Sequence, residues 1–195
     1  PTSDYSASCV MQPRQTLLLV EHDLAAIQTF FSLMRYHDVV VVNSDEALET
    51  RLQDGGVDLV VMNLDALEQD GAAMSRKIKQ LPQSRGVPII ALASSSDCGE
   101  EVTLFQAGAS DYIAKPVHDL VLQARLNFHL ERKRSKDLLE RMARYDELTE
   151  VFNRREFNVS LQSEWQRAAR TESSLAVLMI DVDLFKKYND HYGHG

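Results

Sequence analysis

The stretch VDLVVMNLD, from Val57 to Asp65, joins an almost uninterrupted apolar run to an amide, Asn63, and then to an acid. A strand covered by helices on both faces of a sheet is typically a continuous apolar run, because neither face meets water. We therefore expect residues 58–63 to form a buried strand with Asn63 at its carboxyl end. What an amide does at that position depends on the rest of the chain.

Further apolar runs alternate with stretches of helical periodicity along the first two thirds of the sequence. The five expected strands are residues 16–20, 39–43, 58–63, 87–93 and 111–114. The expected helices are residues 24–36, 44–55, 71–81 and 96–108, and a fifth that follows Lys115-Pro116. This alternation predicts an α/β fold, a doubly wound (βα)5 parallel sheet.

Local signals support several helix ends. Ser44 is expected to cap the second helix, and Ser96 or Asp97 the fourth, which ends in a left-handed turn at Gly108. The periodicity of the first helix predicts one apolar face, formed by Leu24, Ile27, Phe31 and Met34.

Composition excludes several classes of protein. The 195 residues are 44% hydrophobic and 26% charged, as in ordinary globular proteins. We expect no membrane span, because no apolar run approaches the ~18 residues required, and we expect a flexible lead-in at residues 1–15. Two distant cysteines, Cys9 and Cys98, fit a reducing cytoplasm, and the net charge of −8 argues against nucleic-acid binding.

Polar residues gather at the carboxyl ends of the predicted strands, where open α/β sheets place their functional crevice. Strand ends are often polar merely because they meet solvent, but the joint pattern is harder to explain in that way. The residues concerned are Glu21, His22, Asp23, Asn63, Asp65, Ser94 and Lys115.

Residues 16–128 resemble a CheY-like response-regulator receiver domain, with the flavodoxin-like fold, in the segments LLLVEHD, DLVVMNLDAL, PIIALAS and GASDYIAKP. The resemblance implies that Asn63 stands at the phosphate-accepting aspartate. Glu21 and His22 stand at the acidic pair that holds Mg²⁺. Lys115 would bind phosphoryl oxygens and Tyr112 would take part in switching. Ala93 occupies the usual hydroxyl position, and Ser94 follows it.

Asn63 predicts a degenerate receiver. Phosphoryl transfer needs a carboxylate nucleophile, and Mg²⁺ prefers anionic oxygen ligands, so neither phosphate on Asn63 nor tightly bound metal is expected. We expect Asp65 to lie outside the pocket geometry and not to replace the acceptor. Asn63, Glu21 and Lys115 are expected to form a neutralised hydrogen-bond cluster that imitates one switch state. The domain would then serve constitutive dimerisation or docking, or sense another input.

The fifth helix has no evident stop before Tyr145. Its heptad-like seam predicts a parallel two-helix stalk over residues 129–145, the alternative being an amphipathic last helix followed by a solvated linker. The seam residues are Val121, Ala124, Phe128, Glu131, Ser135, Leu138, Met142 and Tyr145.

Residues 146–195 begin with DELTEVFNRREF and a helix to about Arg170 that carries Trp165 on its apolar side. An apolar strand, SLAVLMI at 174–180, precedes DVDLFKKYNDHYGHG. Carboxylates at a strand end followed by lysines and an Asn suit a site for a metal and a nucleoside triphosphate.

This segment resembles the amino-terminal part of the GGDEF domain of diguanylate cyclases. The resemblance implies metal binding by Asp181 and the carbonyl of Val182, with Mg²⁺ held in the complete domain. Phe185 and Lys186 would lie near the GTP phosphates, and Asn189 would contact guanine. The chain departs from the family at Glu150, where a glycine is usual, and a positive φ would strain that residue.

The sequence ends before the Gly-Gly-Asp/Glu-Glu-Phe hairpin. We therefore expect this polypeptide to be inactive. Residues beyond 146 are expected to pack irregularly, to swap between chains or to be stabilised by a neighbour. The resemblance implies a bacterial two-component regulator, the regulatory part of an enzyme that joins two GTP into cyclic di-GMP as a homodimer through receiver and stalk. The alternative is a phosphorylation-independent scaffold on a degenerate GGDEF protein. Asn63 argues against a third possibility, a conventional phosphorelay receiver.

Overall fold

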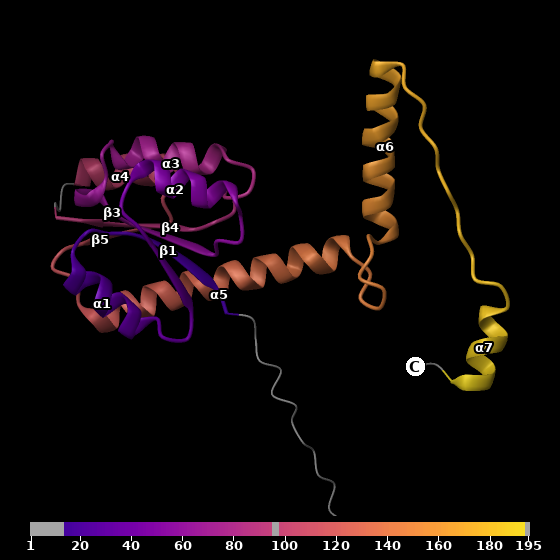
Figure 1. The fold of residues 1–195 in the computed structure, drawn as a ribbon, viewed down its shortest axis with the longest axis horizontal. Coiled ribbons are helices and arrows are strands. Elements are labelled where there is room, and N and C mark those ends of the chain that lie inside the picture. The colour runs from indigo at the N-terminus through magenta and orange to yellow at the C-terminus, as the bar shows by residue number, and fades with distance from the viewer. Residues whose placement is uncertain (1–13, 95–97, 194–195) are drawn as a thin grey trace, which may run out of the picture. The chain divides into compact units, whose positions relative to one another are not determined.

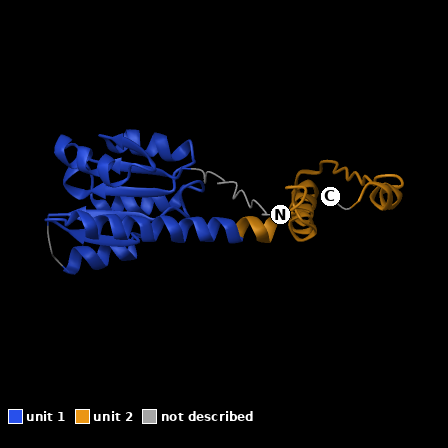
Figure 2. Cartoon of the chain, turned by 90° about the horizontal axis from the view of Figure 1, so that it is seen from below, with its two compact units in different colours: residues 1–139 blue, residues 140–195 orange. Residues whose placement is uncertain are grey.

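The computed structural model describes residues 14–94 and 98–193. The lead-in expected at 1–15 and the cap expected at Ser96 or Asp97 therefore lie almost wholly outside the described residues. The chain divides into two compact units, residues 1–139 and 140–195, shown in blue and orange in Figure 2.

The first unit is built on one parallel sheet of five strands in the order β2-β1-β3-β4-β5, which confirms the predicted fold class. All strands lie within two residues of their expected bounds. They are β1 (Thr16–Val20), β2 (Asp38–Val42), β3 (Leu59–Asn63), β4 (Ile89–Ala93) and β5 (Asp111–Ala114).

Helices cover both faces of this sheet (Figure 1). α1 (Leu24–Leu33) and α5 (Asp119–Arg144) lie on one face. α2 (Asp45–Gln53), α3 (Gly71–Gln80) and α4 (Cys98–Gln106) lie on the other. A short 3-10 helix, η1 (Leu64–Ala66), follows β3 directly.

Alternate residues of the strands supply the two main cores, because successive side chains of a strand point to opposite faces. Leu18, Val60 and Met62 pack in the same core as Leu48 of α2 and Met74 of α3. The opposite core joins alternate strand residues to the two helices on that face: Leu17, Leu19, Leu59, Val61, Phe30, Met34, Leu122, Leu126 and Leu130.

The predicted apolar face of α1 is partly wrong. Phe30 and Met34 are buried, whereas Leu24 is 74% exposed and Phe31 is 47% exposed. The helix carries more apolar residues than one stripe can hold, so periodicity alone did not choose between Phe30 and Phe31. The packing of α1 against the sheet makes that choice.

The cap predicted at Ser44 is confirmed, since its hydroxyl accepts a hydrogen bond from the Ala47 amide at 3.2 Å. Gly108 follows α4 with a φ of +103°, the left-handed conformation expected there. Its neighbour Ala109 closes the turn by donating its amide to the Leu104 carbonyl.

α5 is one continuous helix of 26 residues, about 40 Å long. Leu122, Leu126 and Leu130 are buried on it. The predicted seam lies on another side of the helix and is exposed, as Phe128 (59%) and Leu138 (58%) show. The uninterrupted helix is confirmed, and its pairing with a second copy stays a prediction.

The second unit contains α6 (Arg154–Thr171) and α7 (Phe185–Tyr192). The strand expected at residues 174–180 is wrong, because these residues form no regular structure. A strand needs a neighbour to satisfy its backbone groups, and none of the described residues pairs with this segment. Trp165 is 68% exposed, so its expected apolar side is not covered. Among the described helices, none has the length and apolar character to span a bilayer.

Candidate functional site

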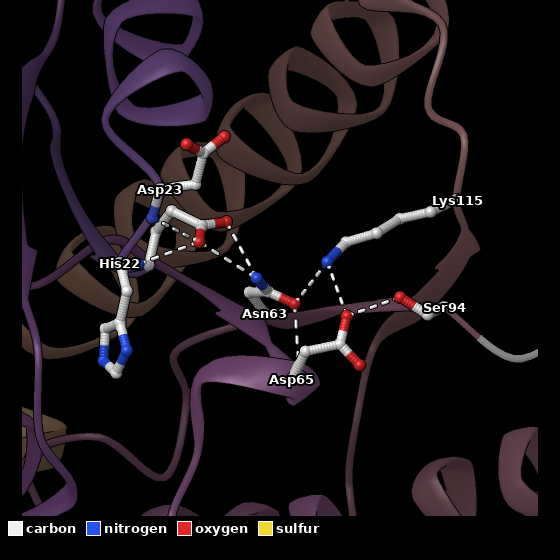
Figure 3. Close-up of polar contacts among 7 residues, drawn as sticks. His22, Asp23, Asn63, Asp65, Ser94 and Lys115 are labelled. Atoms are coloured by element: carbon white, nitrogen blue, oxygen red, sulfur yellow. Dashed lines mark hydrogen bonds and ion pairs between the residues drawn. The ribbon is translucent and has the colours of Figure 1, made fainter.

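The candidate site lies at the carboxyl ends of β1, β3 and β5, where three polar side chains meet (Figure 3). Asn63, the last residue of β3, is 6% exposed, and its side chain is hydrogen-bonded to both Glu21 and Lys115. The parallel sheet brings these residues together although 42 and 52 positions separate Asn63 from the other two. The predicted cluster of Asn63, Glu21 and Lys115 is therefore confirmed.

Glu21 is a buried carboxylate whose oxygens are satisfied by N–H donors. Asn63 Nδ2 donates to both oxygens, at 3.0 and 2.9 Å. The backbone amides of His22 and Asp23 donate to Oε1 at 2.8 and 3.1 Å. These four bonds offset the cost of removing the charge from water.

The amide oxygen of Asn63 faces the opposite way, toward positive charge. Oδ1 accepts a hydrogen bond from Lys115 Nζ at 2.6 Å and a second from the Asp65 amide at 3.2 Å. The second bond caps η1. An amide satisfies this position because it donates to the carboxylate of Glu21 and accepts from the ammonium of Lys115.

The expectation that Asp65 lies outside the pocket geometry is wrong. Asp65 Oδ2 accepts hydrogen bonds from Lys115 Nζ at 2.8 Å and from Ser94 Oγ at 2.5 Å. The reason is η1, which folds residues 64–66 back over the strand end and turns Asp65 toward β4 and β5 (Figure 3). Ser94 thus enters the site through Asp65.

These donors change the acidity of Asp65. The hydrogen bonds from Lys115 and from Ser94 lower the pKa of Asp65; burial opposes them, and the positive charge of Lys115 lowers the pKa further. Half of the side chain is exposed, so solvent screens the interaction. Asp65 is therefore ionised at neutral pH, with one oxygen held between an ammonium and a hydroxyl.

His22 and Asp23 stand beside the site without entering it. The His22 ring turns away from Asn63, and its Nε2 lies 3.0 Å from the Asn43 carbonyl (Figure 3). The Asp23 carboxylate caps α1 by accepting from the amides of Ala25 and Ala26. His22, predicted as part of the pocket, thus contributes its backbone amide and not its ring.

Tyr112 packs away from this network, on β5. It is 8% exposed in a cluster with Ala91 and Leu104, and its hydroxyl donates to Glu100 Oε2 over a long 3.5 Å. The side chain is thus enclosed between β5 and α4.

Residues of the described chain do not form a ready metal centre. Within residues 14–94 and 98–193, no three His, Cys, Asp or Glu side chains converge on a point where they could hold a metal ion. At the receiver site only Glu21 remains of the expected acidic pair, and its oxygens already accept four hydrogen bonds from three nitrogens. These residues do not fit a Mg²⁺ ion, which prefers several anionic or water oxygens.

The residues predicted to bind GTP lie on or beside α7. Phe185, Lys186 and Asn189 belong to that helix, and Asp181 and Val182 precede it. The Val182 carbonyl accepts a hydrogen bond from the Phe185 amide at 3.3 Å. In the part of the chain that is described, no side-chain hydrogen bond or ion pair joins these five residues.

Glu150, which stands where the family usually has glycine, adopts a positive φ of +54°. Its amide donates to the Asp146 carbonyl at 3.0 Å and closes a turn. The Asp146 carboxylate also accepts from the Thr149 hydroxyl and amide, and these bonds lower the pKa of Asp146. The turn is formed, with a charged residue in a conformation that favours glycine.

Comparison with known families matches both parts of the chain. The model described as the response regulator receiver domain matches residues 18–127. The model described as diguanylate cyclase, GGDEF domain, matches residues 143–195.

Similar proteins agree with these matches. Response regulator PleD of Caulobacter vibrioides is 32% identical over 161 residues, which are 79% of this chain and 36% of PleD. The chain thus spans about a third of that relative. The receiver domain of sensor histidine kinase PA1611 of Pseudomonas aeruginosa, solved with magnesium in its active-site cleft, has a TM-score of 0.54 and 27% identity, over 61% of this chain and 99% of its own. A CheY-like receiver of Methanospirillum hungatei (TM-score 0.58, 17% identity, 64% of this chain and 99% of its own) shares the fold.

Proposed function

Because the chain belongs to the response regulator receiver family and continues into the first part of a GGDEF domain, we propose that its receiver regulates a diguanylate cyclase without phosphorylation of Asn63. The relative PleD is itself a response regulator, and the GGDEF family model is described as a diguanylate cyclase. The reaction of the whole protein would join two GTP molecules into cyclic di-GMP. Residues 143–195 hold no Gly-Gly-Asp/Glu-Glu-Phe hairpin, so we propose no such activity for these 195 residues alone.

The observation that carries the proposal is the Asn63 amide between Glu21 and Lys115. A phosphate acceptor at this strand end must attack phosphorus through a carboxylate oxygen. The amide oxygen of Asn63 lacks a full negative charge, and its lone pairs already accept from Lys115 and Asp65. The position therefore serves as a hydrogen-bond bridge.

Asp65 supports a second part of the proposal, a resident anion in place of phosphate. Its Oδ2 binds Lys115 and Ser94, a lysine and a hydroxyl of the kinds that bind phosphoryl oxygens in the resembled family. We propose that this carboxylate holds Lys115 and Ser94 in the positions that they would take around a bound phosphoryl group. The receiver would then signal through its structure and its pairing.

A dimer is the form in which such a receiver would act. Two GGDEF domains, each with one GTP, must meet, and a shared stalk raises their effective concentration. Val121, Phe128, Leu138 and Met142 are all about half exposed on α5, apart from its buried face. We propose that these residues pair with a second copy of the chain.

The proposed GTP site belongs to the complete GGDEF domain. Asp181 and the Val182 carbonyl would hold Mg²⁺ there, Phe185 and Lys186 would lie near the phosphates, and Asn189 would contact guanine. The chemistry of the residues supports this, because carboxylates and carbonyls are hard oxygen ligands and an amide both donates and accepts.

Exposure to acetyl phosphate, followed by intact mass measurement, tests the proposal. The unmodified chain is expected to gain no phosphoryl group, and Asn63→Asp is expected to gain one when Mg²⁺ is present. Asp65→Asn shows whether Asp65 accepts the phosphoryl group in place of Asn63. A stable adduct on the unmodified chain that is lost in Asp65→Asn would overturn the resident-anion proposal. An adduct mapped to Asn63 would overturn the proposal that the receiver acts without phosphorylation of Asn63.

An alternative function, a phosphorylation-independent scaffold on a degenerate GGDEF protein, is favoured by Glu150 alone. A charged residue at φ +54° where glycine is usual indicates relaxed constraint on that turn. Reading the remainder of the gene separates the two. An intact Gly-Gly-Asp/Glu-Glu-Phe hairpin supports the cyclase, and a disrupted hairpin supports the scaffold.

A further inference from the structure

A basic cavity lies on the receiver, away from Asn63. It has a volume of about 270 Å³, and Pro88 and Ser110 in its wall precede β4 and β5, so it opens at the amino ends of these strands. Asn63 stands at the carboxyl end of β3. The two sites therefore occupy opposite edges of the sheet.

Five of the nine residues that line the cavity are lysine or arginine, and none is acidic. This concentration of positive charge is notable because the chain as a whole carries a net charge of −8. The five basic residues are Lys79, Arg85, Arg132, Lys133 and Lys136, and Gly86 lies in the wall beside them.

Two nearby carboxylates already bind residues of the cavity wall, His129 and Lys133. Asp111 binds Arg125 at 2.6 Å and the buried His129 ring at 3.3 Å, and Asp137 binds Lys133 one helical turn away. Within the described residues, no hydrogen bond or ion pair is made by the guanidinium groups of Arg85 and Arg132. Two planar, always charged groups thus face the cavity without a partner anion.

Two lysines of the cavity, Lys79 and Lys136, repel one another. Burial, and then the charge of Lys136, lower the pKa of Lys79, whose ammonium donates to the Val87 carbonyl. A Cβ added to Gly86 would lie 3.9 Å from Lys136 Nζ, so the Lys136 side chain reaches from α5 to the loop before β4. A bound anion would relieve this repulsion.

We propose that this cavity binds a small phosphorylated anion, either inorganic diphosphate or the diphosphate group of a nucleotide. Arginine and lysine clusters recognise phosphate oxygens through paired N–H donors and charge. The volume is below the roughly 300–1,000 Å³ of pockets that enclose drug-sized ligands, so a diphosphate group fits and a whole nucleotide does not. Any nucleoside would project into solvent.

Binding would join two parts of the receiver. Lys79 and Arg85 come from α3 and the loop that follows it, whereas Arg132, Lys133 and Lys136 come from the second half of α5. One anion held by both groups would fix α5 against the body of the receiver, just before the exposed part of the proposed stalk. The anion would thus act on the rigidity of that helix.

Titration calorimetry of the full chain with inorganic diphosphate, at constant ionic strength, tests the proposal. Saturable 1:1 binding is expected, weakened about tenfold or more in Arg85→Gln and in Arg132→Gln, because each loses a charge-assisted bond. Arg134→Gln is the matched control, since it makes the same change on α5 outside the cavity, and it should bind as the unmodified chain does.

The melting temperature supplies a second measurement and identifies the source of the anion. Diphosphate is expected to raise it in the unmodified chain and in Arg134→Gln, and to raise it less in the two cavity variants. Guanosine diphosphate should bind and guanosine should not. Whichever of diphosphate and guanosine diphosphate binds with the lower dissociation constant identifies the source of the anion, free diphosphate or a nucleotide. No binding at millimolar diphosphate, equal weakening in Arg134→Gln, or an equal response to sodium chloride would overturn the proposal.

Discussion

Lys115 Nζ lies 2.8 Å from Asp65 Oδ2, although 50 positions separate the two residues in the chain. The same ammonium also donates to Asn63 Oδ1. One lysine at the end of β5 therefore holds both the Asn63 amide and the Asp65 carboxylate. This arrangement leaves the site filled by the protein's own polar groups.

Asn63→Asp is expected to destabilise the receiver by about 2–4 kcal/mol at neutral pH in the absence of divalent cations. The substitution replaces a donor to Glu21 by a second carboxylate about 3 Å away. Added Mg²⁺ should recover part of the loss, because a cation can lie between the two acids. Urea denaturation with and without EDTA measures both effects.

Asn127→Asp is the control for that experiment, because it makes the same change at an exposed position of α5. Its stability should stay within about 0.5 kcal/mol of the unmodified chain and should not respond to Mg²⁺. If Asn63→Asp behaved in the same way, the amide bridge would have no energetic role.

Asp65→Asn is expected to reduce the loss in the free energy of unfolding that occurs as the pH falls below about 4. The pKa of Asp65 is lowered in the folded chain, so its contribution is complete above the ordinary Asp value of about 3.9 and is lost as the pH falls through the lower folded value. The contribution should not exceed about 1 kcal/mol, because the side chain is half exposed. The difference between the two urea profiles from pH 2 to 6 isolates this carboxylate, and parallel profiles would contradict the prediction.

Leu138→Lys is expected to weaken self-association at least tenfold, because a charge would be buried in the proposed α5 pairing. The folded receiver should keep its stability, since Leu138 is 58% exposed. Light scattering over a range of concentrations gives the dissociation constant. Leu139→Lys is the matched control, as Leu139 is 66% exposed but lies off the seam, and equal weakening by both would place the contact elsewhere.

Leu126→Ala is expected to destabilise the receiver by about 2–5 kcal/mol, because it removes a side chain that is 0% exposed between α5 and the sheet. Leu120→Ala, on the same helix but 68% exposed, should change the free energy of unfolding by no more than about 0.5 kcal/mol. Urea denaturation followed by circular dichroism measures both. Similar losses would contradict the finding that Leu126 faces the sheet and Leu120 faces solvent.

Glu150→Gly is expected to stabilise its turn by about 1 kcal/mol, because glycine adopts φ +54° without the steric cost borne by other residues. Hydrogen exchange of the Glu150 and Asn153 amides, which donate to Asp146 and Arg144, reports the local opening free energy. Glu147→Gly, in the same turn without positive φ, should speed exchange instead. Faster exchange in both variants would mean that Glu150 carries no strain.

Much of the receiver follows from local sequence. The five apolar runs are long enough to mark the strands, and Ser44 marks a helix start through its own hydroxyl, so neither depends on distant residues. The cluster of Asn63, Glu21 and Lys115 was predictable too, because parallel strands bring their carboxyl ends to one edge of the sheet.

The apolar segment 174–180 shows where local sequence fails. Its composition favours a strand, but a strand is stabilised by hydrogen bonds to a neighbour, and no described residue supplies them. The prediction that Phe31 lies on the apolar face of α1 fails for a different reason. α1 has apolar residues on adjoining sides, and only contact with the sheet selects Phe30.

The sequence by itself thus determined the sheet, its covering helices and the presence of an amide at the end of β3, because each depends on residue type and periodicity. Only the tertiary structure decided that Asp65 reaches Lys115 and Ser94, that His22 turns away, and that basic residues of α3 and α5 share a cavity. These contacts join side chains tens of positions apart, and their directions are set by η1 and by the packing of α5, which no local pattern encodes.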